Sequence, residues 1–266
     1  MIQAELALPS PEITDLQLAA SALLVLLAGA ISFLAGLGLL KSLLVGVLRT
    51  VIQLALMGYA LGLIFGLQSP LLVAGVLMLM LLVATREVTR RTRSAYLPPR
   101  LEVLATLALS TFAVTLIMCA VVIRPEPLWT PRVALPIAGM ILGNCLNAAA
   151  LALDRLNAEI RNHLPRIEAL VALGATRWDA ARDPCRAAIR AGMTPILNAL
   201  NVVGIVSLPG VMTGQILAGA DPLGAARYQI VIMLMLGLAA ALTSWPAVRP
   251  GYRRYSDAEG EGKRVV

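Results

Sequence analysis

Apolar runs long enough to cross a lipid bilayer recur along most of this 266-residue chain. A helical span needs roughly 20 residues, because the hydrocarbon layer is about 30 Å thick and each residue adds about 1.5 Å. Hydrophobic residues make up 59% of the sequence and charged residues 14%, a composition outside that of ordinary soluble domains. We therefore predict an all-α fold, that of a polytopic helical membrane protein.

About seven spans are expected, all in one transmembrane domain that covers residues 1–250. A charged tail, residues 251–266, follows this domain and is expected to be disordered. The first apolar run is longer than the core of a signal peptide, so we predict that it is a retained span. The expected spans are residues 16–40, 43–67, 70–84, 101–123, 133–153, 189–217 and 228–248.

The positions of the charges predict how the chain is oriented. Segment 85–100 contains five arginines, whereas the connection around Gln68 and Ser69 contains no charge. Basic loops stay in the cytosol, so this distribution predicts a multi-pass protein of the cell's inner membrane, with its N-terminus outside and its C-terminus cytosolic. All but three of the 22 Lys and Arg residues then lie on the cytosolic side. The net charge of +7 is thus a topogenic signal rather than a sign of nucleic-acid binding.

The sixth expected span, residues 189–217, is too long for one straight crossing of the membrane. Its sequence contains Ser207-Leu208-Pro209-Gly210, where proline removes a backbone donor and glycine tolerates unusual dihedral angles. The helix is therefore predicted to be either broken or kinked there. A broken helix at membrane depth is tolerated where it is buried in protein or lines a cavity.

One long polar stretch, EALVALGATRWDAARDPCRAAIR, runs from Glu168 to Arg190 within the expected cytosolic segment 154–190. Its pattern predicts a helix, a turn at Gly174 and a second helix that opens near Thr176. Helix connections usually need only about 2 to 8 residues, so the stretch is expected to dock onto a cytosolic partner. The alternative is a solvated amphipathic hairpin, or one that lies on anionic lipid.

The residues around this turn resemble the EAA-type coupling loop of ABC-transporter permeases, in which a short helix sits in a cleft of the ATPase subunit. Longer runs, LPIAGMILGN from Leu135 and VGIVSLPGVMTG from Val203, look like the FetB-type permease family associated with iron export. The resemblance covers roughly residues 49–237. Further matching residues are Arg49, Gln53, Gly58 and Tyr59, with segments 218–222 and 228–230. The coupling residues that the resemblance implies are Glu168, Ala169, Leu173, Gly174, Ala175, Thr176, Arg177 and Trp178.

The energy source that the resemblance implies is a separate cytosolic ABC ATPase subunit, which would use ATP and Mg. This chain contains no Gly-x-x-x-x-Gly-Lys-Ser/Thr phosphate loop. We therefore expect it to bind no cofactor and to be a transporter subunit rather than an enzyme, because the spans also offer no acid, base and nucleophile together. A complete ABC transporter needs two membrane halves, which implies a homodimer surrounded by lipid.

Several polar or flexible positions in the spans are candidates for the substrate pathway or for helix packing. Asn144 and Asn147 lie three residues apart, and Asn198 and Asn201 repeat this spacing, so each pair shares one helix face. Amides between helices more often hold a bundle together than contact a ligand. The candidate residues are Arg49, Gln53, Asn144, Asn147, Asn198, Asn201, Pro209, Gly210 and Met212.

Metal ligands cannot be assigned from the residues alone. Ferrous iron prefers imidazole, carboxylate or thiolate ligands, but His163 is expected to be solvated in the cytosolic segment. Methionines in apolar helices are usually packing residues. The spacing of the three cysteines, Cys119, Cys145 and Cys185, indicates neither a disulfide framework nor a metal site.

Iron export thus rests on the resemblance, and other functions stay open. An ABC permease for a polar organic substrate such as a nucleotide sugar fits the residues as well, because asparagine and backbone groups at a broken helix suit polar ligands. A non-transporting membrane scaffold is a second alternative. A proton-coupled transporter would be expected to hold a titratable group at mid-membrane, and the expected spans show none.

Overall fold

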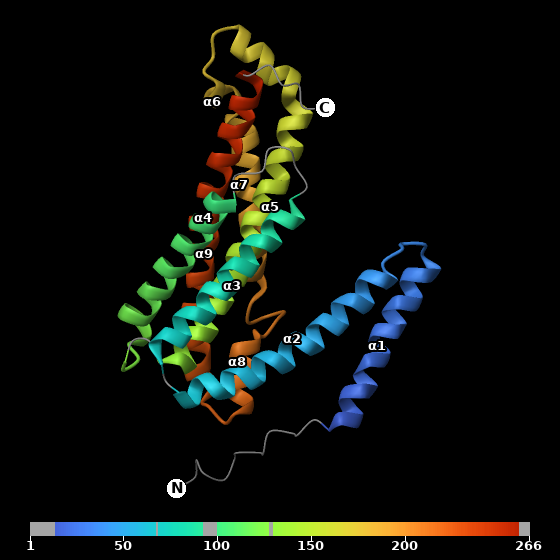
Figure 1. Ribbon diagram of the computed structural model, residues 1–266, viewed down its shortest axis with the longest axis vertical. Helices are drawn as coiled ribbons and strands as arrows, with labels where there is room; N and C mark the ends of the chain where they lie inside the picture. Colours follow the sequence, from blue (N-terminus) through green and yellow to red (C-terminus); the bar gives the residue numbers. More distant parts are fainter. Residues whose placement is uncertain (1–13, 68, 93–99, 128–129, 261–266) are drawn as a thin grey trace. The chain divides into compact units, whose positions relative to one another are not determined.

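The computed structural model describes residues 14–67, 69–92, 100–127 and 130–260, and every regular element in these ranges is a helix (Figure 1). The prediction of an all-α membrane fold is confirmed. The helices are α1 Asp15–Leu34, α2 Leu40–Leu67, α3 Pro70–Arg91, α4 Arg100–Ile117, the π-helix η1 Met118–Ile123, α5 Pro131–Ala172, α6 Arg177–Ala180, α7 Arg182–Val202, α8 Gly210–Leu217 and α9 Pro222–Gly260.

Five helices of the described residues are long and apolar enough to cross a membrane, two fewer than the spans we expected. In α1 the run Leu24–Leu34 is apolar, and it belongs to a helix of 20 residues, Asp15–Leu34. The sixth expected span is divided, because α7 ends at Val202 and α8 begins at Gly210. This division decides between the two predictions for that span: the helix is broken and not merely kinked. The five candidate spans are Leu40–Ile64, Pro70–Arg91, Arg100–Ile123, Pro131–Ala172 and Pro222–Arg249.

The helices form two compact units, which we describe separately. The smaller unit contains α1 and α2, which pack against each other, together with residues 215–220. Thr14 caps α1 by accepting a hydrogen bond from the Gln17 amide, while the Gln17 side chain bonds back to the Thr14 amide. This reciprocal capping box pairs two of the amides that a helix start leaves open.

The larger unit is a bundle in which α5 contacts α3, α4, α7 and α9. Its core contains fully buried side chains such as Leu107, Ile141 and Ile232. Side chains also bond across helices: Ser110 Oγ donates to the Leu242 carbonyl at 3.0 Å. Lipid tails are as apolar as leucine, so close packing and such hydrogen bonds, rather than a hydrophobic drive, hold membrane helices together.

Three helices of this bundle cross closely at Gly192 of α7. A Cβ atom at this position would lie 2.5 Å from Ser244 Oγ on α9 and 2.8 Å from the Ala148 carbonyl oxygen on α5. Real Cβ atoms do not approach so closely, so only glycine allows the crossing. Gly192 therefore places α5, α7 and α9 at one common level.

The membrane boundary lies close to this level. Arg91, at the end of α3, donates from Nη1 to Asn147 Oδ1 at 3.1 Å. A guanidinium is costly in hydrocarbon, so we infer that the edge of the bilayer on α5 lies near this contact. Arg86 lies about 7.5 Å earlier along α3 and is exposed, so its long side chain can reach the same edge. The remainder of α5, from Ala148 to Ala172, is about 37 Å long at 1.5 Å per residue and projects beyond that edge.

This extension corrects two of our expectations. The expected fifth span and the first helix of the polar hairpin are one helix, α5, which contains 42 residues with Pro136 and Pro165 inside it. The expected disordered tail is helical as far as Gly260, because α9 continues beyond its apolar part. Residues 261–266 lie outside the described residues.

The extension has its own hydrophobic core, which explains why α9 stays helical there. Side chains from α5, α6, α7 and α9 meet in it, among them Leu156, Ile160, Cys185 and Tyr252. Tyr252 is only 6% exposed, although it belongs to the segment we expected to be disordered. We call this part of the molecule, residues 148–191 with the end of α9 from Val248 to Tyr252, the cytosolic arm, after the side of the membrane on which we expect it to lie.

Replacing Gly192 with alanine is expected to destabilise the bundle by about 1 to 3 kcal/mol, since the new methyl group has no room. The measurement is the thermal unfolding midpoint of the purified protein in detergent. Gly75→Ala in α3 is the matched control, because nothing lies within 4 Å of a Cβ there and alanine is the better helix former. Equal midpoints for the two variants would contradict the close crossing.

Cys185, about 10 Å outside the boundary along α7, is expected to resist alkylation in the folded protein. It is 2% exposed, and burial raises the pKa of its thiol from 9.0 to about 12. Well below pH 9 the thiol is neutral in both the folded and the unfolded chain. Between pH 9 and 12 it ionises only in the unfolded chain, which favours unfolding, so the folded state loses stability as pH rises through that range.

The check is maleimide labelling at pH 8, mapped by mass spectrometry in detergent and after unfolding in SDS. Labelling of Cys185 should be about tenfold slower or more in the folded state, because the thiolate is the reactive form. The alkaline loss of stability should shrink in Cys185→Ala. Rapid labelling of the folded protein would show that the cytosolic arm is not packed as described.

Candidate functional site

The eight predicted coupling residues gather at the tip of the cytosolic arm, where α5 ends and α6 begins. After Ala172 the chain turns at Gly174, whose φ angle is +93°. The Ala175 amide donates to the Leu170 carbonyl at 3.0 Å, and the Gly174 amide donates to the Val171 carbonyl at 3.0 Å. Such bonds close a helix end around a left-handed glycine. The turn is therefore a defined structure, as the sequence predicted.

The far side of the turn is held by a helix cap. Thr176 Oγ1 accepts a hydrogen bond from the Asp179 amide at 3.1 Å and donates one to the Asp179 carboxylate. Threonine is a favoured N-cap residue, because its oxygen pairs an amide that the helix start leaves open. With both ends paired, the side chains around the turn are presented on a firm backbone.

Apolar side chains are exposed at this tip. Leu173 is 86% exposed and Trp178 is 43% exposed, and Glu168 and Ala169 are exposed beside them. A large aliphatic side chain and an indole at the end of an otherwise charged arm are typical of a protein contact. The arrangement can therefore dock onto a second protein.

Trp178 also connects the tip with α9, which the sequence did not predict. Its ring meets that of Tyr252 edge to face, with the ring centroids 5.2 Å apart and an interplanar angle of 73°. Aromatic pairs in this geometry stabilise by about 0.5–1.5 kcal/mol beyond the area they bury. No pattern in the sequence could have indicated this pair, because the two residues are far apart along the chain.

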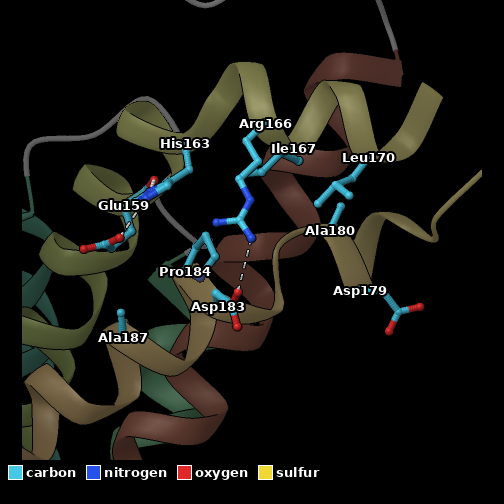
Figure 2. Close-up of a pocket in the computed structure, with 10 residues that line it drawn as sticks. All are labelled: Glu159, His163, Arg166, Ile167, Leu170, Asp179, Ala180, Asp183, Pro184 and Ala187. Atoms are coloured by element: carbon cyan, nitrogen blue, oxygen red, sulfur yellow. Dashed lines mark hydrogen bonds and ion pairs between the residues drawn. The ribbon is translucent and has the colours of Figure 1, made fainter. Parts of the chain in front are cut away.

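A cavity of about 200 Å³ lies beneath the tip, between α5 and the α6–α7 segment. Figure 2 shows Arg166 reaching across it toward Asp183, with Nη2 4.0 Å from the carboxylate oxygen. His163, which we expected to be solvated, is partly covered, and its Nδ1 lies 3.2 Å from Glu159 Oε2. Glu159 also pairs with Arg155. The carboxylates of Glu159 and Asp183 thus each face an arginine, so the cavity has a structural explanation.

The two asparagines of α5 make different contacts. Asn144 Nδ2 donates to the Leu236 carbonyl of α9 at 2.9 Å, within the bundle. Asn147 accepts from Arg91 at the membrane boundary and is exposed. Asn144 thus connects two helices, and Asn147 lies at the edge of the bilayer rather than in its interior.

The remaining polar candidates are divided between the two units. Asn198 and Asn201 are exposed on α7, directly before the break that contains Pro209. Gly210 begins α8 and Met212 is half-buried there. Arg49 and Gln53 are exposed on α2, in the other unit. The structure therefore brings the α7 asparagines together with the break.

Metal ligands are as scarce in the fold as in the sequence. Among the described residues there is no group of three or more His, Cys, Asp or Glu side chains that could hold a metal ion. Cys119, Cys145 and Cys185 are all buried as free thiols. Cys145 lies 3.9 Å from the Ala239 carbonyl, so its thiol takes part in packing between α5 and α9.

Comparison with known proteins agrees with a membrane assignment. A UPF0014 membrane protein of Synechocystis is 42% identical over 78% of this chain and 80% of its own length. Arabidopsis thaliana Protein ALUMINUM SENSITIVE 3 is 32% identical, covering 86% of this chain and 85% of its own length. The probable iron export permease protein FetB of Escherichia coli is 32% identical over 92% of this chain and 93% of its own length. No solved structure matches.

The relatives also bear on our expectation that this chain is no enzyme. The Synechocystis relative is described as a membrane protein and the Escherichia coli relative as a probable permease, in agreement with that expectation. The sequence profile described as "Uncharacterised protein family (UPF0014)" matches residues 15–256, which is nearly the whole chain. The chain therefore belongs to the UPF0014 family of multi-pass membrane proteins.

Proposed function

We propose that this chain is the membrane-spanning permease subunit of an ABC transporter that exports iron or another metal. A separate cytosolic ATPase supplies the energy by using ATP and Mg, and two copies of the chain form the membrane part. The observation that carries the proposal is the tip of the cytosolic arm, where Leu173 and Trp178 are exposed on a capped turn. Such a tip fits a cleft of a partner protein.

The helices of the arm suit the transmission of force. α5 runs as one helix from Pro131, at the opposite end of the bundle, to Ala172 at the tip. α7 returns from Arg182 and packs along it. A rigid helix pair that is clamped at Gly192 moves its membrane end when its tip moves, which is the mechanical requirement for coupling.

The charges of the larger unit support a cytosolic arm. Arginines of α3 and α4 lie at the end of the bundle from which the arm projects, and Arg91 marks that boundary. The opposite end has only a few basic residues, among them Arg124 and Arg132. The positive-inside rule thus supports our proposal that the arm lies in the cytosol, with the N-terminus outside the cell and the C-terminus inside.

Iron is proposed from the name of the Escherichia coli relative and not from a ligand cluster. One observation favours the alternative of a polar organic substrate such as a nucleotide sugar: the described spans offer amides and backbone groups rather than metal ligands. A third possibility is a membrane scaffold that recruits a partner without transport. Flux after reconstitution separates these functions.

Replacing Leu173 with aspartate is expected to reduce co-purification of the ATPase with the tagged chain by about tenfold or more. The apolar contact that Leu173 makes with the ATPase is lost, and a charge is introduced into the interface. Leu173 is 86% exposed, so the chain itself should still fold. Asn162→Asp is the control, since this exposed residue lies about 15 Å back along α5. If the ATPase accompanies both variants equally, the tip is not its docking site.

Replacing Gly174 with valine is expected to uncouple ATP hydrolysis from transport. A β-branched residue is strained at a φ of +93°, so the turn must open and the tip loses its shape. Gly174→Asn is the control, because asparagine tolerates the left-handed region. The measurement is ATP hydrolysis together with substrate flux in proteoliposomes, and normal coupled flux in Gly174→Val would refute the role of this turn.

A further inference from the structure

The break between α7 and α8 lies near the middle of the membrane. Gly192 and Ala148 are at the level of the Arg91–Asn147 contact, which marks the cytosolic boundary. At 1.5 Å per residue, Val202 at the end of α7 is about 15 Å further along the helix than Gly192. This distance is half of a hydrocarbon layer about 30 Å thick. Figure 1 shows α7 giving way to coil before α8 begins.

Several backbone acceptors at the break are unpaired. The Val202 carbonyl accepts from the amides of Ile205, Val206 and Ser207, and the Gly204 amide donates to the Ser207 carbonyl at 2.9 Å. Among the described residues, however, no donor reaches the carbonyl oxygens of Gly204, Ile205 and Val206. An unpaired carbonyl in hydrocarbon costs several kcal/mol, so these oxygens must meet something polar.

Two amide side chains lie next to these carbonyls along the chain. Asn198 and Asn201 are exposed, and their spacing of three places them on one face of the last turns of α7. No hydrogen bond joins either side chain to another described residue. The C-terminus of α7 adds partial negative charge, because a helix dipole is negative at that end.

All of these features attract positive charge through neutral oxygen atoms. Carboxylate, imidazole and thiolate groups, which replace the water around a transition metal, form no cluster in the described residues. Carbonyl and amide oxygens instead accept hydrogen bonds from the water molecules around a hydrated ion. We propose that Asn198, Asn201 and the open carbonyls of residues 204–206 form a mid-membrane site that binds a divalent cation with its water shell in place.

This inference rests on the proposed function and deepens it, because it names the chemical form in which the cargo passes. It explains how a metal exporter can function with no ligand cluster among the described residues. It also puts the cargo where movement of the arm acts, since α7 leads from the arm to the break. The water molecules, and not the protein, then contact the metal.

The test uses hexaamminecobalt(III), whose six ammine ligands exchange too slowly to be replaced and which resembles a hydrated cation. Its binding to the purified full-length chain in detergent is measured by ⁵⁹Co NMR line broadening. We expect saturable binding that ferrous ion displaces. Only a site that takes an ion with its ligand shell in place can accept this complex. Absence of saturable binding would therefore overturn the proposal.

Variants with opposite expected effects separate the site from misfolding. Asn201→Leu should weaken binding of the complex tenfold or more, and Asn201→Asp should tighten it, because a carboxylate attracts the cation more strongly. Leu197→Ala, at an exposed apolar position on the same helix, should leave binding unchanged. The proposal is overturned if both Asn201 variants bind as the unmodified chain does, or if both lose binding equally while remaining monodisperse.

ATP-driven ferrous flux, measured with the ATPase in proteoliposomes, distinguishes this inference from the proposed function. If flux occurs and hexaamminecobalt(III) inhibits it, both metal export and the hydrated-ion site stand. If flux occurs without inhibition, metal transport stands and the hydrated-ion site fails. If the complex binds but no ferrous flux is seen, the site stands for cations and iron export fails.

Discussion

The close crossing of α5, α7 and α9 at Gly192 is the contact on which the rest of the larger unit depends. A side chain of any size there would push α7 away from the Ala148 carbonyl and from Ser244. Helices in lipid gain little from burying apolar surface, so approach of their backbones must supply much of the attraction. From Gly192, α7 extends in one direction into the cytosolic arm and in the other direction to the break after Val202.

The two ends of α7 therefore share one mechanical element. Outside the boundary it packs with α5 and α9 around a separate core that contains Cys185 and Tyr252. Inside, it runs along the bundle and ends unsupported at Val202, where Ile205 is 91% exposed and Val206 78% exposed. A push on the firm end is delivered to the open end, because α7 is a single helix between them, with one proline, Pro195, inside it.

Hydropathy predicted most of the fold, and turn chemistry predicted the tip. The apolar runs indicated where helices cross the membrane, and Gly174 and Pro209 indicated the turn and the break correctly, because both residues act locally on the backbone. Hydropathy predicts where the chain leaves the hydrocarbon layer, but it does not predict whether the helix ends at that point. The sequence for this reason did not reveal that α5 continues to Ala172 or that Tyr252 packs against Trp178. Those features depend on long-range contacts that no local pattern records.

A site made only of neutral oxygen atoms also fits the energetic constraints of the membrane. A carboxylate at mid-membrane would itself need a partner whenever the cargo is absent, and such unpaired charges are costly there. Stripping water from a small divalent ion is costly as well, and the His, Cys, Asp and Glu side chains that could replace that water do not cluster in the described residues. Retaining the water shell avoids both costs. The ion then needs only acceptors and a wet passage, and a broken helix provides acceptors without placing any formal charge in the membrane.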